Sequence, residues 1–284
     1  TPRAVATHLM MQARPDLSTS AETVYLAASV HLSAPPELLS LAARFPGGCG
    51  SDWMYHQLQV ANGNAIMRVP AVRWTLELVD DIKAFTAAQR TCSQYGGFMS
   101  QAQLFDNHTF GLSILEAGSM DPHQRMLLET SYTVFHSAGQ RKALLAGCEL
   151  PVLLGIERSD WMLSQLPRTK SSVYEVSSTH ESVASGRISF SLGLQGVCMS
   201  INAACASTLV AVHAAKCFSH AQSYNKDGSM AAALGASLKL HPASTLAIAA
   251  AGMLSVDGRC KTLDKRANGY VRSECIGALT LQCG

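Results

Sequence analysis

The clearest pattern of apolar positions along the chain predicts a helix that begins after Asp121. Asp121 can act as the N-cap, Pro122 fits the first helical position, and Gln124 completes a capping box. Apolar side chains then recur near helical spacing, at Leu127, Leu128, Val134, Phe135 and Ala138. Gly139 follows as a C-terminal cap, so the pattern predicts both ends of this helix.

Further along the chain, the patterns predict strands around a second helix. In Val197–Asn202, Val197, Met199 and Ile201 alternate with small or polar residues, which is typical of a strand. Ala206–His220 is rich in apolar residues and lacks proline and glycine, so a helix is expected directly after that strand. Ser229–Leu240 and Ile276–Leu281 are predicted to be buried strands. This mixture of strands and helices indicates the α/β class.

The beginning of the chain differs from the rest. Residues 1–34 are rich in Ala, Ser and Thr and show no sustained period, so we interpret them as a linker or the remnant of an upstream region. A packed domain is predicted over residues 35–284. It opens with the apolar segment Leu38–Ala43, which ends at the turn residues of Phe45–Gly48.

Composition supports a large folded core and excludes several classes of protein. Of 284 residues, 48% are hydrophobic and only 15% are charged, so many side chains must be buried. The net charge of +2 gives no sign of a nucleic-acid-binding protein. The most apolar stretch, Ala231–Leu254, is interrupted by Lys239, His241 and Pro242, so we expect no membrane span and a soluble protein. Because the chain begins at Thr1 and not at methionine, an upstream targeting peptide stays an open question.

The cysteines favour a reducing compartment. The chain has nine, an odd number, and none of them forms a Cys-x-x-Cys pair. Free thiols inside the cell, in the cytoplasm or an organelle stroma, therefore explain them better than a set of disulfides in a secreted protein.

Cys205 is the candidate nucleophile, because it lies where the predicted strand passes into the helix Ala206–His220. The first N–H groups of a helix lack partners and carry partial positive charge, which favours a thiolate at this position. The small neighbours Ala203, Ala204 and Ala206 leave room for a substrate. The alternative is a buried structural thiol, since free cysteine is among the most buried residue types.

The other chemical motifs are weak or absent. His213 cannot be the base for Cys205, because eight residues of helix place it ~12 Å away. His213 and Cys217 share one helix face, but no further ligand occurs at zinc spacing, so we expect no metal site. The sequence has no Gly-Lys dipeptide, G-x-G-x-x-G or G-x-S-x-G, which argues against nucleotide binding and serine hydrolysis.

Several short blocks in the sequence are similar to a known family and follow its order. They are Ala43–Gly48, Val69–Trp74, Gly96–Phe98, Met120–Glu129, Ser185–Phe190, Ile201–Leu209, Met253–Lys261 and Gly269–Arg272. Together they resemble the beta-ketoacyl synthase, or ketosynthase, domain of type I polyketide and fatty acid synthases, in the thiolase superfamily. The Ile201–Leu209 block is similar to the family's active-site segment Asp-Thr-Ala-Cys-Ser-Ser-Ser-Leu, whose cysteine corresponds to Cys205. The resemblance implies a thiolase-like fold with α/β/α/β/α layers.

The resemblance also implies a reaction and its partners. Cys205 would accept an acyl group as a thioester, and a malonyl-type extender on acyl carrier protein would lose carbon dioxide and attack it. Substrates would arrive on the phosphopantetheine of the carrier, and no cofactor would be bound directly. The family further implies a homodimer with the Val197–Asn202 strand near the two-fold axis. Whether fatty acid or polyketide is made is left open.

The sequence also departs from the family pattern. The family's two catalytic histidines lie in His-Gly-Thr-Gly-Thr and Asn-x-Gly-His motifs, and none of the ten histidines here fits either. We therefore interpret residues 35–284 as the N-terminal half of the two-fold pseudo-repeat, as a fragment or a degenerate protein. Ala206 replaces a usual serine, and Ser273-Glu274-Cys275 stands where Gly-Glu-Gly is expected, which puts a tight loop in doubt.

Three functions are consistent with these observations. The first is an acyltransferase of the ketosynthase type that needs its C-terminal half. The second is a truncated, non-catalytic ketosynthase-like protein that only dimerises or docks carrier protein. The third is an enzyme similar to thiolase or chalcone synthase, which would share the cysteine but would not predict the block from Asp121 to Arg125.

Overall fold

A computed structural model describes residues 35–76, 79, 82–165, 173–222 and 229–283. Contacts between residues divide the chain into Thr1–Pro35 and Pro36–Gly284. The segment 1–34, which we interpreted as a linker, lies outside the described residues. Apart from Pro35, all described residues belong to the second unit.

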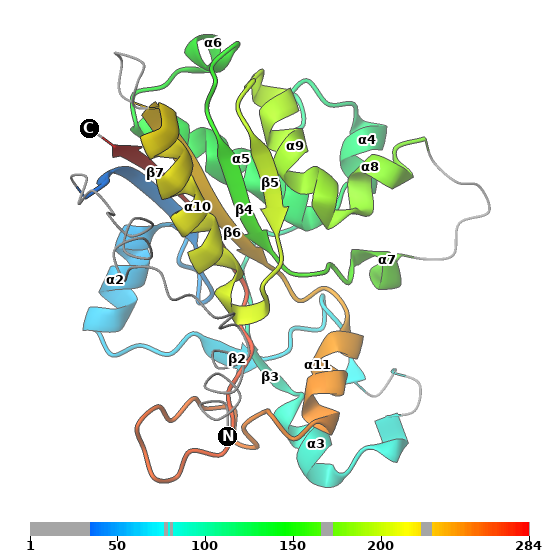
Figure 1. The fold of residues 1–284 in the computed structure, drawn as a ribbon. Helices are drawn as coiled ribbons and strands as arrows, with labels where there is room; N and C mark the ends of the chain where they lie inside the picture. Colours follow the sequence, from blue (N-terminus) through cyan, green and yellow to red (C-terminus); the bar gives the residue numbers. More distant parts are fainter. Residues whose placement is uncertain (1–34, 77–78, 80–81, 166–172, 223–228, 284) are drawn as a thin grey trace, which may run out of the picture. The chain divides into compact units, whose positions relative to one another are not determined.

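A five-stranded sheet forms the centre of this unit (Figure 1). Its strands, in spatial order, are β1 (Glu37–Arg44), β7 (Cys275–Cys283), β6 (Ser229–Ser237), β4 (Val152–Ile156) and β5 (Cys198–Ile201). β4 is parallel to both β5 and β6, whereas β7 is antiparallel to β6 and β1. The carboxyl ends of β1, β4, β5 and β6 therefore lie at one edge of the sheet, together with the start of β7.

One face of the sheet is covered by a large apolar core. The helix α5 (Pro122–Ser137) packs on this face together with α9 (Glu181–Leu192). Met126, Leu127, Val134 and Phe135 of α5 are fully buried against apolar residues of the strands. Every second residue of each strand points to this face. Together with α5 and α9, these residues form the largest group of buried apolar side chains in the described chain.

The opposite face of the sheet is covered by α10 (Ser207–Gln222), as Figure 1 shows. The contact is made by small residues, because Ala211 and Ala215 of the helix pack on Ala231 and Ala233 of β6. α10 connects the end of β5 to the start of the parallel strand β6, so it runs antiparallel to both. Its N-terminus therefore lies at the carboxyl edge of the sheet.

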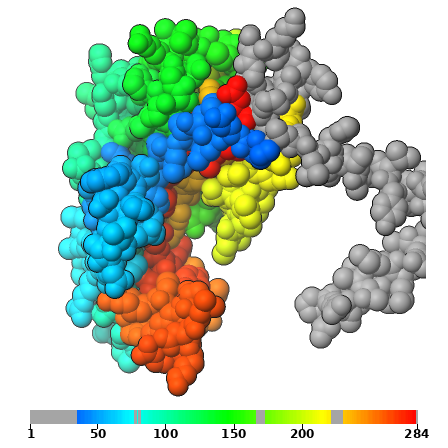
Figure 2. Space-filling view, turned by 90° about the vertical axis from the view of Figure 1, so that its left-hand side faces the viewer, coloured from blue at the N-terminus to red at the C-terminus, as the bar shows by residue number. Residues whose placement is uncertain are grey.

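The remaining elements lie around this centre and are short. β2 (Ile66–Arg68) and β3 (Tyr95–Gly97) form a small antiparallel pair. The helices are α2 (Asp52–Val60), η3 (Ile82–Ala84), α3 (Ala87–Cys92), α4 (Ile114–Ser119), α6 (Lys142–Leu145), α7 (Trp161–Ser164), α8 (Glu175–Thr179), η4 (Ala204–Ala206) and α11 (Pro242–Ala250). Figure 2 shows β1 and α2 at the surface, with the end of β7 beside β1.

The predicted elements are confirmed, with one correction. The helix after Asp121 is α5, the strand and helix around Cys205 are β5 and α10, and the two later strands are β6 and β7. The predicted capping box is wrong. Asp121 does accept a hydrogen bond from the N–H of His123, but the Gln124 side chain donates to the carbonyl of Ser177 instead of turning back to the cap.

The most apolar stretch, Ala231–Leu254, is divided among β6, a loop and the nine-residue helix α11. The interruption at Pro242 is the start of α11, where proline is well tolerated. Within the described ranges, no helix has the length and hydropathy that a membrane crossing requires.

Candidate active site at the start of α10

Cys205 lies in η4, the single turn that joins β5 to α10, and its side chain is exposed. This is the strand-to-helix junction that the sequence predicts. Figure 1 shows the turn at the carboxyl ends of β4, β5 and β6. The alternative of a buried structural thiol is therefore wrong for the described chain.

The turn around Cys205 is held in an unusual backbone conformation. Ala204 has a φ of 51°, in the left-handed region that residues with a Cβ rarely adopt. Side chains on both sides fix this conformation. The Ser207 hydroxyl accepts a hydrogen bond from the N–H of Ala203 at 2.8 Å and donates to the carbonyl of Ala204 at 2.7 Å, while Asn202 Oδ1 accepts from the N–H of Ala204. A local reversal of the chain thus presents Cys205 to solvent.

Glycines allow the first turn of α10 to lie directly on the sheet. A Cβ at Gly155 of β4 would come within 2.5 Å of the backbone nitrogen of Thr208, and one at Gly235 of β6 would come within 2.5 Å of the Thr208 hydroxyl. Gly155 pairs with Gly235 in the sheet register, and Gly235 pairs with Gly277 of β7. We call Gly155, Gly235 and Gly277 the glycine row. Because they have no Cβ, α10 can pack close to the sheet, and this distance sets the position of Cys205.

A cluster of charged side chains lies just beyond the glycine row. Glu157 follows β4, and its Oε1 accepts hydrogen bonds from the ammonium of Lys239 and from the hydroxyl of Ser237, the latter at 2.7 Å. The guanidinium of Arg272 lies 3.5 Å from Glu157 Oε2 and donates to the hydroxyls of Ser244 and Thr245. One carboxylate is therefore held by two cations.

The environment of this cluster shifts the pKa values of its members. Burial raises the pKa of Glu157, but the ammonium of Lys239, the hydroxyl of Ser237 and the guanidinium of Arg272 together outweigh this and hold the pKa below its ordinary value. Burial, together with Arg272, lowers the pKa of Lys239 against the effect of Glu157. At neutral pH the carboxylate is ionised.

The segment Ser273-Glu274-Cys275, where the family has Gly-Glu-Gly, packs closely against Gly97 of β3. Ser273 fits because its neighbour is Gly97, where an added Cβ would lie only 2.4 Å from the Ser273 hydroxyl. Glu274 is fully buried, and its carboxylate accepts from the N–H groups of Met99 and Lys239 and pairs with Arg73. The doubt about this loop is thus removed: a serine at 273 is compatible with it.

Cys275 itself lies on the face of the sheet that α10 covers, next to Ser237 of β6 in the register. The alternation along β7 shows this, because Leu279 and Leu281 pack with α10, whereas Ile276 and Ala278 belong to the α5 core. Burial raises the pKa of the Cys275 thiol to about 11. Cys275 is thus a neutral thiol close to the start of α10.

The histidines of the described chain do not act on Cys205. Among the residues the structure describes, Cys205 makes no hydrogen bond. His213 Nε2 lies 3.7 Å from Cys217 Sγ, further along α10, and the described residues bring no third ligand to this pair. His123 is buried, donates from Nδ1 to Asp121 and accepts from the N–H of Leu238 with Nε2, so its ring links α5 to the segment that follows β6.

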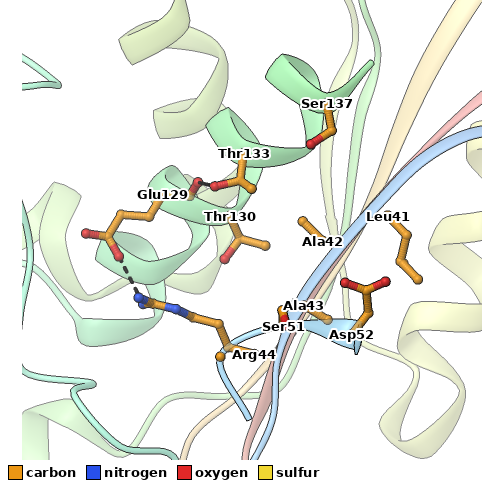
Figure 3. Close-up of a pocket in the computed structure, with 11 residues that line it drawn as sticks. Leu41, Ala42, Ala43, Arg44, Ser51, Asp52, Glu129, Thr130, Thr133 and Ser137 are labelled. Carbon is orange, nitrogen blue, oxygen red and sulfur yellow. Dashed lines mark hydrogen bonds and ion pairs between the residues drawn. The ribbon is translucent and has the colours of Figure 1, made fainter. Parts of the chain in front are cut away.

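A surface cavity of about 450 Å³ lies elsewhere, at the β1 edge of the sheet (Figure 3). β1 and α5 form two of its walls, and an ion pair of 3.0 Å joins Arg44 to Glu129 inside it. In the strand order, β1 and β5 are at opposite edges. This cavity is therefore separate from the Cys205 site.

These features define an α/β protein with an exposed cysteine on a turn at a helix N-terminus. Comparison with known proteins gives the family. Residues 38–283 match the model of the beta-ketoacyl synthase N-terminal domain, so the chain belongs to the beta-ketoacyl synthase family. The resemblance of the sequence blocks is thereby confirmed.

Similar proteins are polyketide synthases. The chain is 35% identical over 256 residues to a component of the phenolphthiocerol/phthiocerol polyketide synthase of Mycobacterium tuberculosis, covering 89% of this chain and 16% of that protein. It is 34% identical over 262 residues to polyketide synthase GfsA of Streptomyces halstedii, covering 90% of this chain and 3% of that protein. The chain thus spans a small part of the relatives it matches.

Among solved structures, the chain is similar to the ketosynthase from module 6 of the bacillaene synthase of Bacillus subtilis 168. The TM-score is 0.73 and the identity 30%, over 87% of this chain and 40% of that chain. The thiolase-like fold expected from the sequence is confirmed by this likeness. The sheet with helices on both faces corresponds to one part of that layered fold.

Sequence patterns predict Cys205 as the candidate nucleophile, but they do not indicate the charged cluster beyond the glycine row. The patterns do not bring Glu157, Lys239 and Arg272 together, and they give no role to Gly155. Two signals were present. A glycine inside a buried apolar strand often marks a close backbone approach, and a lysine inside an apolar stretch is rarely buried without a partner.

Proposed function

We propose that this chain supplies the acyl-accepting nucleophile of a decarboxylating Claisen condensation in polyketide biosynthesis, as a 3-oxoacyl-[acyl carrier protein] synthase type of acyltransferase. The observation that carries the proposal is the position of Cys205, exposed on a turn at the start of α10. Membership of the beta-ketoacyl synthase family supports it.

The first half of the reaction uses groups present in this chain. Cys205 Sγ attacks the carbonyl carbon of an acyl thioester, and the thiol of the incoming carrier leaves with the proton. The left-handed Ala204 turns the sulfur away from the helix, so a thioester can approach it from solvent.

The second half needs groups that the described residues do not place beside Cys205. A malonyl-type extender loses carbon dioxide, and the resulting carbanion attacks the acyl carbon and expels the Cys205 thiolate. The enolate and the tetrahedral oxyanion both need hydrogen-bond donors, and one lost donor costs ~10²- to 10³-fold in rate. We therefore expect the 284-residue chain alone to accept an acyl group and not to release carbon dioxide from malonyl carrier protein.

Intact-mass measurement after incubation with an acyl thioester tests this proposal. We expect one acyl group per chain, located on Cys205 by peptide mapping and absent in Cys205→Ala. Cys217→Ala is the matched control, because Cys217 is also an exposed thiol on α10. Acylation that persists in Cys205→Ala would contradict the proposal. A folded chain that accepts no acyl group at all would favour the non-catalytic, interaction-only alternative.

The proposal includes an acyl carrier protein as partner, with substrates on its phosphopantetheine, and no directly bound cofactor. It also includes a homodimer through β5. What supports the dimer is that, among the residues the structure describes, β5 pairs only with β4, and that Val197 and Met199 are more than two-fifths exposed. A second β5 would satisfy this free edge. Light scattering should give the mass of a dimer, and a stable monomer at micromolar concentration would contradict this part.

A further inference from the structure

Glu157 and Cys205 lie at about the same level along the sheet, as the rise of the backbone from one shared contact shows. Gly155 of β4 touches Thr208 at the first turn of α10. From this contact, Glu157 is two strand residues further toward the carboxyl edge, ~6.6 Å. Cys205 is three residues before Thr208 on a helix that runs antiparallel to β4, ~5–6 Å in the same direction.

Glu157 also lies on the face of the sheet where α10 begins. Its partner Ser237 is two residues after Gly235, which faces Thr208, while Ala236 and Leu238 on either side of Ser237 belong to the core on the opposite face. The hydrogen bond from Ser237 to Glu157 thus fixes the carboxylate on the α10 face. This carboxylate therefore lies on the same face of the sheet as the first turn of α10, near the level of Cys205.

Charge and exposure show what this carboxylate can bind. The Lys239 and Arg272 side chains are only 6% and 10% exposed, whereas that of Glu157 is 37% exposed. Two buried cations thus hold one accessible carboxylate, so the net charge of the cluster is not negative. A ligand with an ammonium group would therefore gain little binding energy beside Glu157. A neutral hydroxyl can donate a charge-assisted hydrogen bond to Glu157 Oε2, which holds only the long 3.5 Å contact with Arg272.

We propose that Glu157 is a specificity-determining residue of the Cys205 site, which selects acyl groups carrying a hydroxyl within the first carbons from the thioester over saturated groups of equal length. This inference rests on the proposed acylation of Cys205. A saturated chain that excludes solvent would leave the accessible carboxylate without a donor, whereas a hydroxyl on the acyl group supplies one.

The test compares two thioesters of one length, a 3-hydroxyacyl and a saturated acyl N-acetylcysteamine thioester. Their rates of Cys205 acylation on the 284-residue chain are followed by intact mass. Because a hydrogen bond to a charged group is worth about a factor of ten or more, we expect the hydroxyacyl group to react roughly tenfold faster. In Glu157→Gln the ratio should fall to about threefold or less.

Glu129→Gln is the matched control, since Glu129 is another carboxylate paired with an arginine, but on α5 and remote from Cys205. Its rate ratio should equal that of the wild type. Glu157→Gln leaves two buried cations without a carboxylate, so the double variant Glu157→Gln with Lys239→Gln restores the charge balance and should show the same low ratio if the single variant unfolds.

The outcomes separate this inference from the proposed function. Equal acylation rates for the two thioesters in the wild type, or an unchanged ratio in the charge-balanced double variant, would overturn the role of Glu157 and leave acylation of Cys205 intact. A folded wild-type chain that takes neither acyl group would overturn the proposed function itself, and with it this inference.

Discussion

The helices α5 and α10 have sixteen residues each and cover opposite faces of the same sheet, yet their sequences serve different purposes. α5 buries ten side chains, including the large Phe135 and Met126. α10 contacts the sheet through small residues, and its Leu209 is 72% exposed. A helix that stabilises a fold needs bulk against the sheet. A helix that positions a nucleophile needs to lie close to the sheet, and only small residues and glycines permit such a close approach.

The exposed face of α10 adds to this contrast. Leu209 and Val210 are apolar, follow Cys205 closely and are exposed within the described unit. The ketosynthase of the bacillaene synthase is about two and a half times as long as the part matched here, since the match covers 40% of it. We expect the face of α10 to be covered in a protein of that length.

The largest expected effect comes from truncating a large side chain on each helix. Phe135→Ala should lower the free energy of unfolding by ~3–5 kcal/mol, because the ring is fully buried in the α5 core. Leu209→Ala on α10 should change it by less than ~0.5 kcal/mol in the isolated chain. Urea unfolding measures both. A loss above ~1 kcal/mol in Leu209→Ala would show that this face is already covered in solution.

The next effect concerns the close approach of α10. Gly155→Ala places a Cβ 2.5 Å from the backbone nitrogen of Thr208, so the first turn must move. We expect a loss of ~1–3 kcal/mol in stability and slower acylation of Cys205. Gly118→Ala in α4 is the control, because a Cβ there meets nothing within 4 Å. Equal behaviour of the two variants would contradict the glycine row as the device that positions the helix.

An effect of similar size, also on the α10 face, depends on pH. The pKa of Cys275 is raised to about 11 in the folded chain from its ordinary value of 9.0, so folding favours the neutral thiol. Stability from this group is complete below about pH 9 and is lost as pH rises toward about 11. Wild-type protein should therefore lose ~2 kcal/mol more than Cys275→Ala between these pH values, out of ~1.4 kcal/mol for each pKa unit over the whole titration. Parallel urea titrations of the two proteins at several pH values measure this, and equal slopes would contradict the burial of Cys275.

How far the sequence predicted the fold depended on how local each signal was. The ends of α5 and the junction at Cys205 follow from caps, periodicity and a change of pattern within a few residues. β4 was missed although it is central, because Val152–Ile156 is buried on both faces and shows no alternation. Without β4 in place, Gly155 within it could not be interpreted as a contact for α10.

The candidate site was predictable in part for the same reason. Cys205 has a local signature, whereas Glu157, Lys239 and Arg272 come from three segments that only the sheet register brings together. The capping role expected of Gln124 failed because the Ser177 carbonyl, 53 positions further along the chain, competes for its amide. Sequence spacing cannot rank a local partner against a distant one.

The smallest expected effect tests the turn before α10. Ala204 is in the left-handed region with a φ of 51°, which costs ~1–2 kcal/mol for a residue with a Cβ. Ala204→Gly removes that cost but adds ~0.5–1 kcal/mol of backbone entropy in the unfolded chain, so we expect a net gain of no more than ~1 kcal/mol. Ala251→Gly is the control, because Ala251 ends α11 with an ordinary φ of −72° and should only lose stability. A glycine substitution in α5 should bring no comparable gain, because that helix is stabilised by its large buried side chains. If Ala204→Gly were as unfavourable as Ala251→Gly in urea unfolding, the left-handed turn that presents Cys205 would not exist in solution.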